Sequence, residues 1–385
     1  MMKRKVCVLT GSRSEYGILR PVLFLIRESP SLELSLIVTG MHLSPQYGYT
    51  ISDIEKDGLF IDAKVDMTLD SSSGIAMAKS VGIGVIGLSQ TLETLKPDII
   101  VIVGDRIEPL ALAIAATYMN IPVAHIHGGD KSIGGHVDDS IRHVITKMAQ
   151  IHFVATEESG TRIIKMGEDP SKVFVVGAPA LDTIFNEPLL EKEVLCIKYG
   201  LNPSYQIIMV VQNPVTREVN QAPDQMKETL EALVNIKQQT VIIYPNSDMG
   251  GRKMIEVFNE YKKYPFIKIA KNMPHRDYLS LMKISSALVG NSSSAIIEAP
   301  SFKLPAVNIG SRQEGRQRAD NVIDVPYNRD LIAAAIKTAI SDKKFINRVK
   351  TCKSPYGDGT ASEKIVKVLT EIELSGDLLK KKITY

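Results

Sequence analysis

Short apolar runs rich in β-branched residues alternate with helical stretches through the first half of the chain. The runs lie at 5–11, 32–40, 98–106, 122–127, 151–157 and 172–177, and the helical stretches at 18–29, 73–95, 108–119, 138–149 and 159–167. Parallel strands need a crossover connection, which is usually a helix. The alternation therefore predicts a doubly wound parallel sheet.

The same pattern restarts after a polar, proline-containing stretch at 177–188. Strands are expected at 206–214, 240–248, 266–271, 287–293 and 304–310, and helices at 223–238, 250–263, 275–284, from 294, and at 329–340, 343–350 and 361–374. The sequence thus predicts two doubly wound α/β domains, 1–185 and 186–365, followed by a C-terminal helix and a solvated tail at 366–385.

Composition excludes several classes of protein. A net charge of +3 and the absence of Trp argue against a nucleic-acid partner. No run approaches the ~18 apolar residues of a membrane span, and the apolar stretch 72–95 contains polar residues, so a core helix is expected there. Cys7, Cys196 and Cys352 are too scattered for a disulfide framework. A cytoplasmic protein without a membrane partner is expected.

The loops that follow the strands are the places to look for ligands, because ligands bind beyond the carboxyl ends of parallel strands. In GSRSEYG (11–17), Arg13 and backbone N–H groups could hold a phosphate, although a plain tight turn fits equally well. In GNSSSAIIEA (290–299), the serines form an anion cradle and Glu298 could bind a ribose diol. An ordinary helix cap with a surface glutamate is the alternative.

Two further loops contain charged groups. NIGSRQEGRQR (308–318) suits a diphosphate, because guanidinium groups bind phosphate oxygens in pairs, although it could be a solvated basic loop. In VGDR (103–106), Asp105 follows the most apolar strand, where partial desolvation suits a general base. A helix cap, or a pair with Arg106, is the alternative for this carboxylate.

Five of the seven histidines lie between residues 125 and 152, and three of them fall in HIHGGDKSIGGHVDD (125–139). The five are His125, His127, His136, His143 and His152. His-x-His with an aspartate is an acceptable zinc ligand set. An acid/base or substrate-contacting site and a plain polar loop remain open beside it.

Eight stretches together carry a resemblance to the UDP-N-acetylglucosamine 2-epimerase family. They are GSRSEYGILRPVL, TGMHLSPQYGYT, KPDIIVIVGDR, PVAHIHGGD, DDSIRHVITK, GEDPSKVFVVGAPALD, GNSSSAIIE and NIGSRQEGR. The match runs in order from residue 11 to about 318, and it is closest to the hydrolysing branch, which serves sialic-acid-type sugar synthesis. The resemblance implies a GT-B fold with the active site in the interdomain cleft.

The resemblance also implies a reaction: UDP-N-acetylglucosamine and water give N-acetylmannosamine and UDP through a glycal. It implies no metal and no other cofactor, and relatives form homodimers or homotetramers. Asp105, His127 and Asp138 match catalytic positions, His127 standing where some members have glutamate. Candidate substrate contacts are Arg13, Glu15, Arg106, Asp139, Arg142, Asn213, Asn246, Met273, Ser292, Ser293, Glu298 and Arg312.

Asn213 departs from the family, whose members commonly have a histidine there. Asparagine cannot transfer a proton, although it can hold a sugar hydroxyl or a phosphate oxygen. Three alternatives therefore stay open. The same chemistry could act on a UDP- or GDP-linked 2,4-diacetamido-trideoxyhexose, the chain could be a GT-B glycosyltransferase, or it could be a nucleotide-sugar binding protein.

Overall fold

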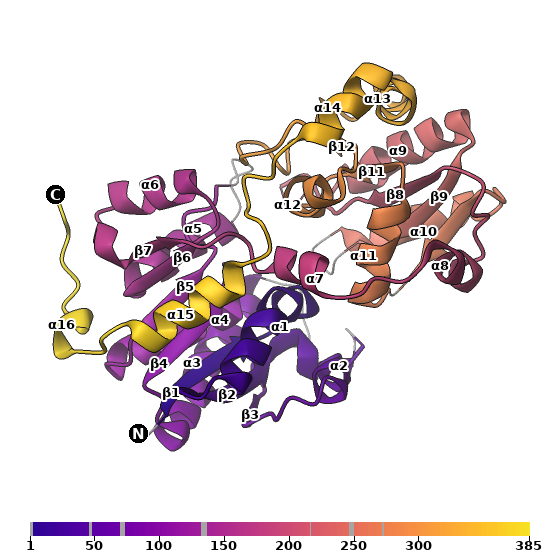
Figure 1. Ribbon diagram of the computed structural model, residues 1–385. Helices are drawn as coiled ribbons and strands as arrows, with labels where there is room; N and C mark the ends of the chain where they lie inside the picture. The colour runs from indigo at the N-terminus through magenta and orange to yellow at the C-terminus, as the bar shows by residue number, and fades with distance from the viewer. Residues whose placement is uncertain are drawn as a thin grey trace. The chain divides into compact units, whose positions relative to one another are not determined.

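The computed structural model describes residues 3–45, 48–69, 74–131, 137–215, 217–245, 250–271 and 273–385. The chain forms two compact units, each built on its own parallel sheet (Figure 1). The first unit contains Met1–Lys131, Val137–Phe185 and Tyr356–Tyr385, and the second contains Asn186–Pro355. The expected second domain ending at 365 is therefore wrong at its C-terminal end, because the chain returns to the first unit at Tyr356.

The first sheet has the strand order β3-β2-β1-β4-β5-β6-β7, and all its neighbouring strands are parallel. The strands are β1 (Arg4–Thr10), β2 (Leu32–Thr39), β3 (Ala63–Val65), β4 (Ile99–Val103), β5 (Val123–Ile126), β6 (Ile151–Val154) and β7 (Val173–Val175). Every residue of β4 is buried, as expected for a strand covered by helices on both faces. The strand order reverses direction between β1 and β4, so the loops after these two strands lie at the ligand-binding edge.

Helices cover both faces of this sheet (Figure 1). They are α1 (Arg13–Glu28), α2 (Ile51–Lys56), α3 (Gly74–Leu95), α4 (Ile107–Tyr118), α5 (Val137–Met148), α6 (Glu157–Lys165), α7 (Ala180–Asn186), α15 (Ala361–Glu371) and α16 (Gly376–Leu379), with 3-10 turns at Gly40–Leu43 and Pro170–Lys172. Leu23 of α1 and Leu369 of α15 belong to one core. Leu88 of α3 and Leu112 of α4 belong to the other. The doubly wound arrangement predicted for residues 1–185 is present.

The second sheet has the order β10-β9-β8-β11-β12-β13 and is also parallel. Its strands are β8 (Ile207–Val211), β9 (Gln239–Ile243), β10 (Ile267–Ala270), β11 (Ala287–Gly290), β12 (Ala306–Ile309) and β13 (Val322–Val325). Its helices are α8 (Lys192–Tyr199), α9 (Ala222–Ile236), α10 (Gly251–Tyr261), α11 (His275–Ile284), α12 (Ser294–Ile297), α13 (Arg329–Ser341) and α14 (Lys343–Thr351), with a 3-10 turn at Ala299–Phe302. The strand order reverses direction between β8 and β11. The loops after these two strands therefore lie at the ligand-binding edge of the second sheet, as the loops after β1 and β4 do in the first.

Helices α1 and α12 differ most from expectation at their ends. Helix α1 begins at Arg13 rather than 18, because the Ser12 side chain accepts a hydrogen bond from the Glu15 amide and caps the helix. Helix α12 spans only Ser294–Ile297, and a 3-10 turn containing Pro300 replaces its continuation. The serine loop, residues 291–293 after β11, therefore precedes a single helical turn and not a long helix.

Helix α3 is long and apolar enough to cross a membrane, by length and composition alone. Leu88 and Leu92 pack into the core of the first unit, whereas Ile75 and Ile86 are exposed. The expected core helix is therefore a surface helix with one buried face.

The C-terminal tail is not the solvated end that its three consecutive lysines suggest. Leu378 is buried in the core of the first unit, and the Lys381 side chain is only 22% exposed. The Thr384 amide donates a hydrogen bond to the Gly167 carbonyl, at 3.3 Å. The tail therefore belongs to the structure of the first unit.

Candidate active site

Arg142 joins the acidic residues at the carboxyl edge of the first sheet. Asp105 follows β4 after Gly104, and Arg142 projects from the second turn of α5. The guanidinium donates hydrogen bonds to Asp105, to Asp139 Oδ1 at 2.5 Å and to the Asp130 carbonyl at 2.9 Å. Burial opposes the charge of Arg142, but Asp105, Asp130 and Asp139 outweigh it and raise its pKa. A buried cation thus fixes two carboxylates next to each other.

Of the two neighbouring aspartates of α5, Asp139 reaches this cluster. Asp138 lies in the first turn of α5 and is exposed, whereas Asp139 is partly buried and bonded to Arg142. The sequence predicts a catalytic role for Asp138 and a substrate contact for Asp139. Arg142 therefore holds Asp139 in place, and Asp138 is exposed at the start of the helix.

His127 lies at the end of β5 in an unusual backbone conformation. Its φ is 64°, a left-handed conformation that is uncommon for residues other than glycine and is often found at functional sites. Its Nδ1 lies 3.5 Å from Asp130 Oδ2, and the other Asp130 oxygen accepts a hydrogen bond from the Ser159 hydroxyl at 2.9 Å. Asp130 therefore contacts both the His127 ring and Ser159 through its side chain, while its carbonyl accepts a hydrogen bond from Arg142.

The remaining histidines separate instead of converging. His125 lies inside the sheet, and His152 pairs with Glu168 at 3.1 Å. His136 lies outside the described residues. Across the described part of the chain, no three His, Cys, Asp or Glu side chains gather as metal ligands would. The described histidines therefore serve different local roles.

A second carboxylate pair is buried beside Arg106. Arg106 Nε lies 3.3 Å from Glu108 Oε2 and 4.0 Å from Glu15 Oε1, and the Gly11 amide donates to Glu15 Oε2 at 2.7 Å. Burial, followed by the nearby charge of Glu108, raises the pKa of Glu15 to about 8. Glu15 therefore holds its proton to higher pH than an ordinary glutamate does.

Glu108 is a member of this pair that sequence reasoning missed. It is 1% exposed, and a Cβ on Gly11 or Gly40 would lie within 3.0 Å of its side chain. The signal was an acidic residue at the start of the otherwise apolar helix IEPLALAIAATY, directly after the GDR turn. Gly11 and Gly40, which lie outside α4, leave the space that this carboxylate occupies. The packing around Glu108 is therefore specific for a buried polar group.

Arg13 is the first residue of α1 and lies at the same edge of the sheet. Its Nε is 3.8 Å from Asp53 Oδ2, and its side chain is 37% exposed. This side chain is thus partly exposed at the edge where an anion would bind.

Asn291 organises the corresponding edge of the second sheet. The Asn213 amide donates to Asn291 Oδ1 at 2.7 Å, and Asn291 Nδ2 donates to the Asn213 carbonyl at 2.8 Å. Arg312 Nη1 and Gln313 Nε2 both donate to the Asn291 carbonyl, at 3.1 Å and 2.9 Å. The loops after β8, β11 and β12 are thus tied together through one asparagine, to which the sequence alone assigns no role.

The close approach of β11 and β8 requires glycine at position 290. Gly290 has a φ of 130°, and a Cβ there would lie 2.2 Å from the Val211 carbonyl oxygen. This contact brings the serine loop against the end of β8.

Ser292, Ser293 and Glu298 all lie in the loop and turn after β11. Ser292 is 8% exposed, its hydroxyl accepts a hydrogen bond from the Ser294 amide at 3.3 Å, and Ser293 precedes the first residue of α12. Desolvation raises the pKa of Glu298, although a hydrogen bond with Ser294 opposes the rise. Hydroxyl groups, amides and one carboxyl group are thus collected on a short stretch beside Arg312.

Two predicted contacts do not join this group. Met273 is buried in the apolar core of the second unit, near Val211. Asn246 lies outside the described residues.

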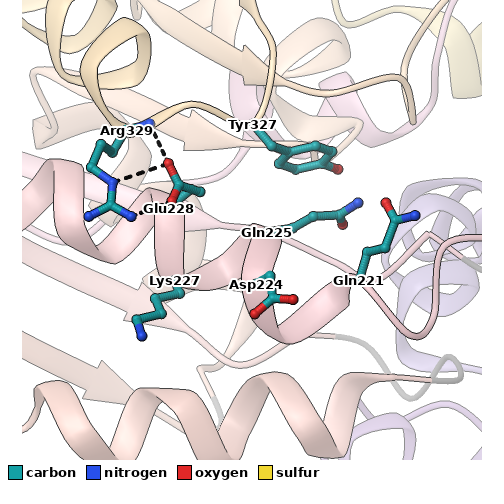
Figure 2. Close-up of a pocket in the computed structure, with 7 residues that line it drawn as sticks. All are labelled: Gln221, Asp224, Gln225, Lys227, Glu228, Tyr327 and Arg329. Carbon is teal, nitrogen blue, oxygen red and sulfur yellow. Dashed lines mark hydrogen bonds and ion pairs between the residues drawn. The ribbon is translucent and has the colours of Figure 1, made fainter.

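A shallow pocket of about 450 Å³ lies elsewhere in the second unit, at the start of α9. Figure 2 shows the Glu228–Arg329 ion pair on one side of it and the Tyr327 ring on another. The Tyr327 ring packs against Gly310, where a Cβ would lie 2.4 Å from the ring. Tyr327 therefore connects the pocket to the arginine-containing loop at 308–318. The pocket contains none of the predicted site residues, and we place the candidate site at the strand edges instead.

Comparison with known proteins identifies a family that matches most of the chain. The family model described as UDP-N-acetylglucosamine 2-epimerase matches residues 25–370. The chain is 39% identical to UDP-N,N'-diacetylbacillosamine 2-epimerase (hydrolyzing) of Legionella pneumophila, covering 99% of each chain. It is 37% identical to the GDP/UDP-N,N'-diacetylbacillosamine 2-epimerase (hydrolyzing) of Campylobacter jejuni, covering 85% of this chain and 86% of the relative.

The fold has a close counterpart among solved structures. The crystal structure of UDP-GlcNAc 2-epimerase from Neisseria meningitidis bound to UDP-GlcNAc superposes with a TM-score of 0.83 at 18% identity, covering 96% of this chain and 100% of that one. The two Rossmann-like units thus form the GT-B fold expected from the sequence. The chain belongs to the UDP-N-acetylglucosamine 2-epimerase family, in its hydrolysing branch.

Proposed function

We propose that the protein is a hydrolysing 2-epimerase whose substrate is a UDP-linked 2,4-diacetamido sugar, UDP-N,N'-diacetylbacillosamine. The observation that carries the proposal is the Asp105–Arg142–Asp139 cluster at the carboxyl edge of the first sheet, in a chain of this family. The choice of sugar rests on the relatives from Legionella pneumophila and Campylobacter jejuni. UDP-N-acetylglucosamine is the second candidate, supported by the family description.

In the proposed first step, Asp105 removes the proton at C2 of the sugar while the C1–O bond to UDP breaks. The electron pair of the C2–H bond forms the C1–C2 double bond of a glycal, and the pair of the C1–O bond leaves with UDP. Arg142 orients Asp105 in this scheme, because its buried guanidinium donates a hydrogen bond to Asp105 Oδ2. The carboxylate is then ready to accept a proton.

In the second step, water adds across the double bond. Its hydroxyl group attaches to C1, and a proton reaches C2 from the opposite face, which inverts that carbon. We assign this proton transfer to His127, oriented by Asp130, with Asp138 as a further proton-handling group. The products are UDP and the free 2-epimeric sugar.

Departure of UDP requires stabilisation of its growing negative charge. We assign this role to Arg312 and the hydroxyl and amide groups of Ser292 and Ser293, with Glu298 on the ribose diol. Asn291 holds the loops of these residues together through its bonds to Asn213 and Arg312. Asn213 then acts as a loop anchor and needs no proton of its own, which fits its departure from the histidine of other family members.

The test is an NMR time course in deuterated water with each sugar nucleotide separately. We expect UDP and a free 2-epimeric sugar with deuterium at C2, formed faster from UDP-N,N'-diacetylbacillosamine than from UDP-N-acetylglucosamine. Faster turnover of UDP-N-acetylglucosamine would reverse the choice of sugar. Transfer of the sugar to an added acceptor would indicate a glycosyltransferase, and binding without turnover of any UDP- or GDP-sugar would indicate a binding protein.

A further inference from the structure

The last residues of the chain lie against α5, the helix that carries Asp139 and Arg142. Helix α16 ends at Leu379, and the segment after it runs past the loop that follows α6. The Thr384 hydroxyl donates to the Glu168 carbonyl at 3.3 Å, and a Cβ on Gly167 would lie 2.7 Å from the Tyr385 ring. Gly167, with a φ of 89°, thus leaves the space that Tyr385 fills.

Lys381 is the residue of this segment that reaches inward. Its ammonium donates a hydrogen bond to the Thr146 carbonyl at 2.8 Å and another to the Ala149 carbonyl. These are carbonyls of the last turn of α5 and the residue after it, where a helix has unpaired acceptors and partial negative charge. Lys381 is thus a C-terminal cap supplied to α5 from a distant part of the chain, 235 residues beyond Thr146.

A buried carboxylate fixes the position of this ammonium. Glu168 is 2% exposed and lies 2.7 Å from Lys381, 2.6 Å from Lys147 and 3.1 Å from His152. Burial opposes the charge of Glu168, but the hydrogen bonds from these three partners outweigh it and lower its pKa to about 2. Lys147 is on α5 itself, so Glu168 joins the tail to this helix.

Two sets of contacts connect helix α5 to Asp105. Through Arg142 it contacts Asp105 directly. Through the Thr146 hydroxyl it contacts His125 Nδ1 at 3.4 Å, and His125 Nε2 lies 2.7 Å from the carbonyl of Gly104, the residue before Asp105. A carbonyl can only accept, so Nε2 carries the proton and Nδ1 accepts from Thr146. Burial lowers the pKa of His125 to about 3, which keeps this ring neutral and the arrangement in place.

We propose that Lys381 is a positioning residue for catalysis, which sets the place of α5 and thereby of Arg142 and Asp105. The proposal rests on the proposed function, because it assumes that Asp105 removes the C2 proton. Lys381 contacts Thr146, which lies one helical turn beyond Arg142 and also bonds His125. Loss of the cap therefore disturbs both sets of contacts with Asp105, and leaves Arg312 and Glu298 unchanged.

The experiment compares Lys381→Met with Lys381→Arg and with Lys382→Met, whose parent lysine is the exposed neighbour. Loss of the capping charge leaves the last carbonyls of α5 without this partner, so we expect kcat to fall by about tenfold in K381M with KM changed less than about twofold. K381R should restore kcat, and K382M should match the wild type. Wild-type kcat in K381M, or an equal fall in K382M, would overturn the proposal.

The pH profile is a second readout that a merely structural role would not change. Burial lowers the pKa of Lys381 to about 8, despite its contact with Glu168. The charged groups that face it are Glu168 and Lys147, with His152 behind them. We expect kcat of the wild type to fall as pH rises through about 8, and the fall to be smaller in K381R. Glu15 titrates in the same range in both proteins, so the difference between them isolates Lys381.

Hydrogen exchange separates failure of this proposal from failure of the proposed function. In K381M we expect faster amide exchange in α5 and at residues 104–108, and unchanged exchange in α1. A chain ended after Lys380 should show the same change. If no UDP-sugar is turned over by the wild type, the proposed function fails, and exchange still decides whether Lys381 holds α5. Unchanged exchange in both variants would contradict the positioning role.

Discussion

Glu15 and Glu108 are two buried carboxyl groups that face the same guanidinium, that of Arg106. One cation cannot neutralise two buried carboxylates, so the proton stays on Glu15 to higher pH than usual, and its pKa is about 8. The first unit therefore contains a charge balance that changes near neutral pH, next to Asp105.

The first prediction concerns stability and pH. The pKa of Glu15 is raised on folding, so its stabilising contribution is complete below the ordinary value of 4.5 and is lost as pH rises through about 8. Between pH 5 and 9, the free energy of unfolding should fall by a few kcal/mol in the wild type, because a tenfold change in a protonation equilibrium corresponds to about 1.4 kcal/mol. Glu15→Gln should flatten this dependence, as measured by urea denaturation. Glu28→Gln, at the exposed end of the same helix, should leave it unchanged.

The second prediction concerns Arg142. Arg142→Gln leaves Asp105 and Asp139 without their buried cation, which should lower the free energy of unfolding by roughly 3–5 kcal/mol and abolish turnover. Arg142→Lys keeps the charge but cannot bond both carboxylates and the Asp130 carbonyl in one plane, so it should recover stability better than kcat. Thermal melts and NMR turnover assays measure the two effects. Arg27→Gln, a more exposed site, serves as the control, and equal recovery of both quantities by R142K would speak against the planar bridge.

The third prediction concerns the base. Asp105→Asn keeps the size of the side chain and can still accept a hydrogen bond from Arg142, but it cannot take a proton. We expect turnover and deuterium incorporation at C2 to be lost while UDP affinity, measured by calorimetry, changes little. An active D105N protein would move the role of base to another residue, with His127 the next candidate.

The fourth prediction concerns the ribose contact. Glu298→Ala should weaken UDP binding by roughly 1–3 kcal/mol, because a partner of the ribose hydroxyls is removed. Glu314→Ala, an exposed carboxylate in the neighbouring loop, is the matched control. UDP affinities that are equal in the two variants would exclude Glu298 from the ribose site.

The fifth prediction compares two glycines, Gly290, which allows two strands to approach closely, and Gly82, which only lowers helix propensity. Gly290→Ala places a methyl group 2.2 Å from the Val211 oxygen and should destabilise the second unit by several kcal/mol or prevent its folding. Gly82→Ala, in the exposed middle of α3 with no atom within 4 Å of the new methyl group, should instead stabilise the protein by roughly 0.5–1 kcal/mol. Thermal unfolding of both variants checks the contrast in sign.

Apolar periodicity was enough to locate most of the sheet strands, because a strand such as β4 is buried at every position and its composition shows it. The edge strands β3 and β13 carry no prediction, because at three and four residues they are too short to show a period and each includes an exposed position. Helix ends were less accurate, because caps such as Ser12 depend on single hydrogen bonds.

The candidate site is partly visible in the sequence because Asp105, His127 and Ser292 lie within two residues of the ends of strands. Glu108 and Asn291 were given no role, since their importance comes from contacts with residues distant in sequence. Lys381 was hidden for a different reason: a lysine among lysines is typical of a solvated tail, and only the fold brings it to Thr146. Sequence pattern reports which edge of a sheet binds a ligand, and the tertiary contacts decide which polar side chain is fixed there.

The return of the chain at Tyr356 has a consequence for synthesis. Helix α15 contributes Ile365 and Leu369 to the core that contains β1, and the Arg4 guanidinium bonds the Leu369 carbonyl. A growing chain therefore presents all of Asn186–Pro355 before it can complete its N-terminal unit. The unit that contains β1 is therefore the last to close, and until α15 has been synthesised the apolar surface that it covers stays open to chaperones.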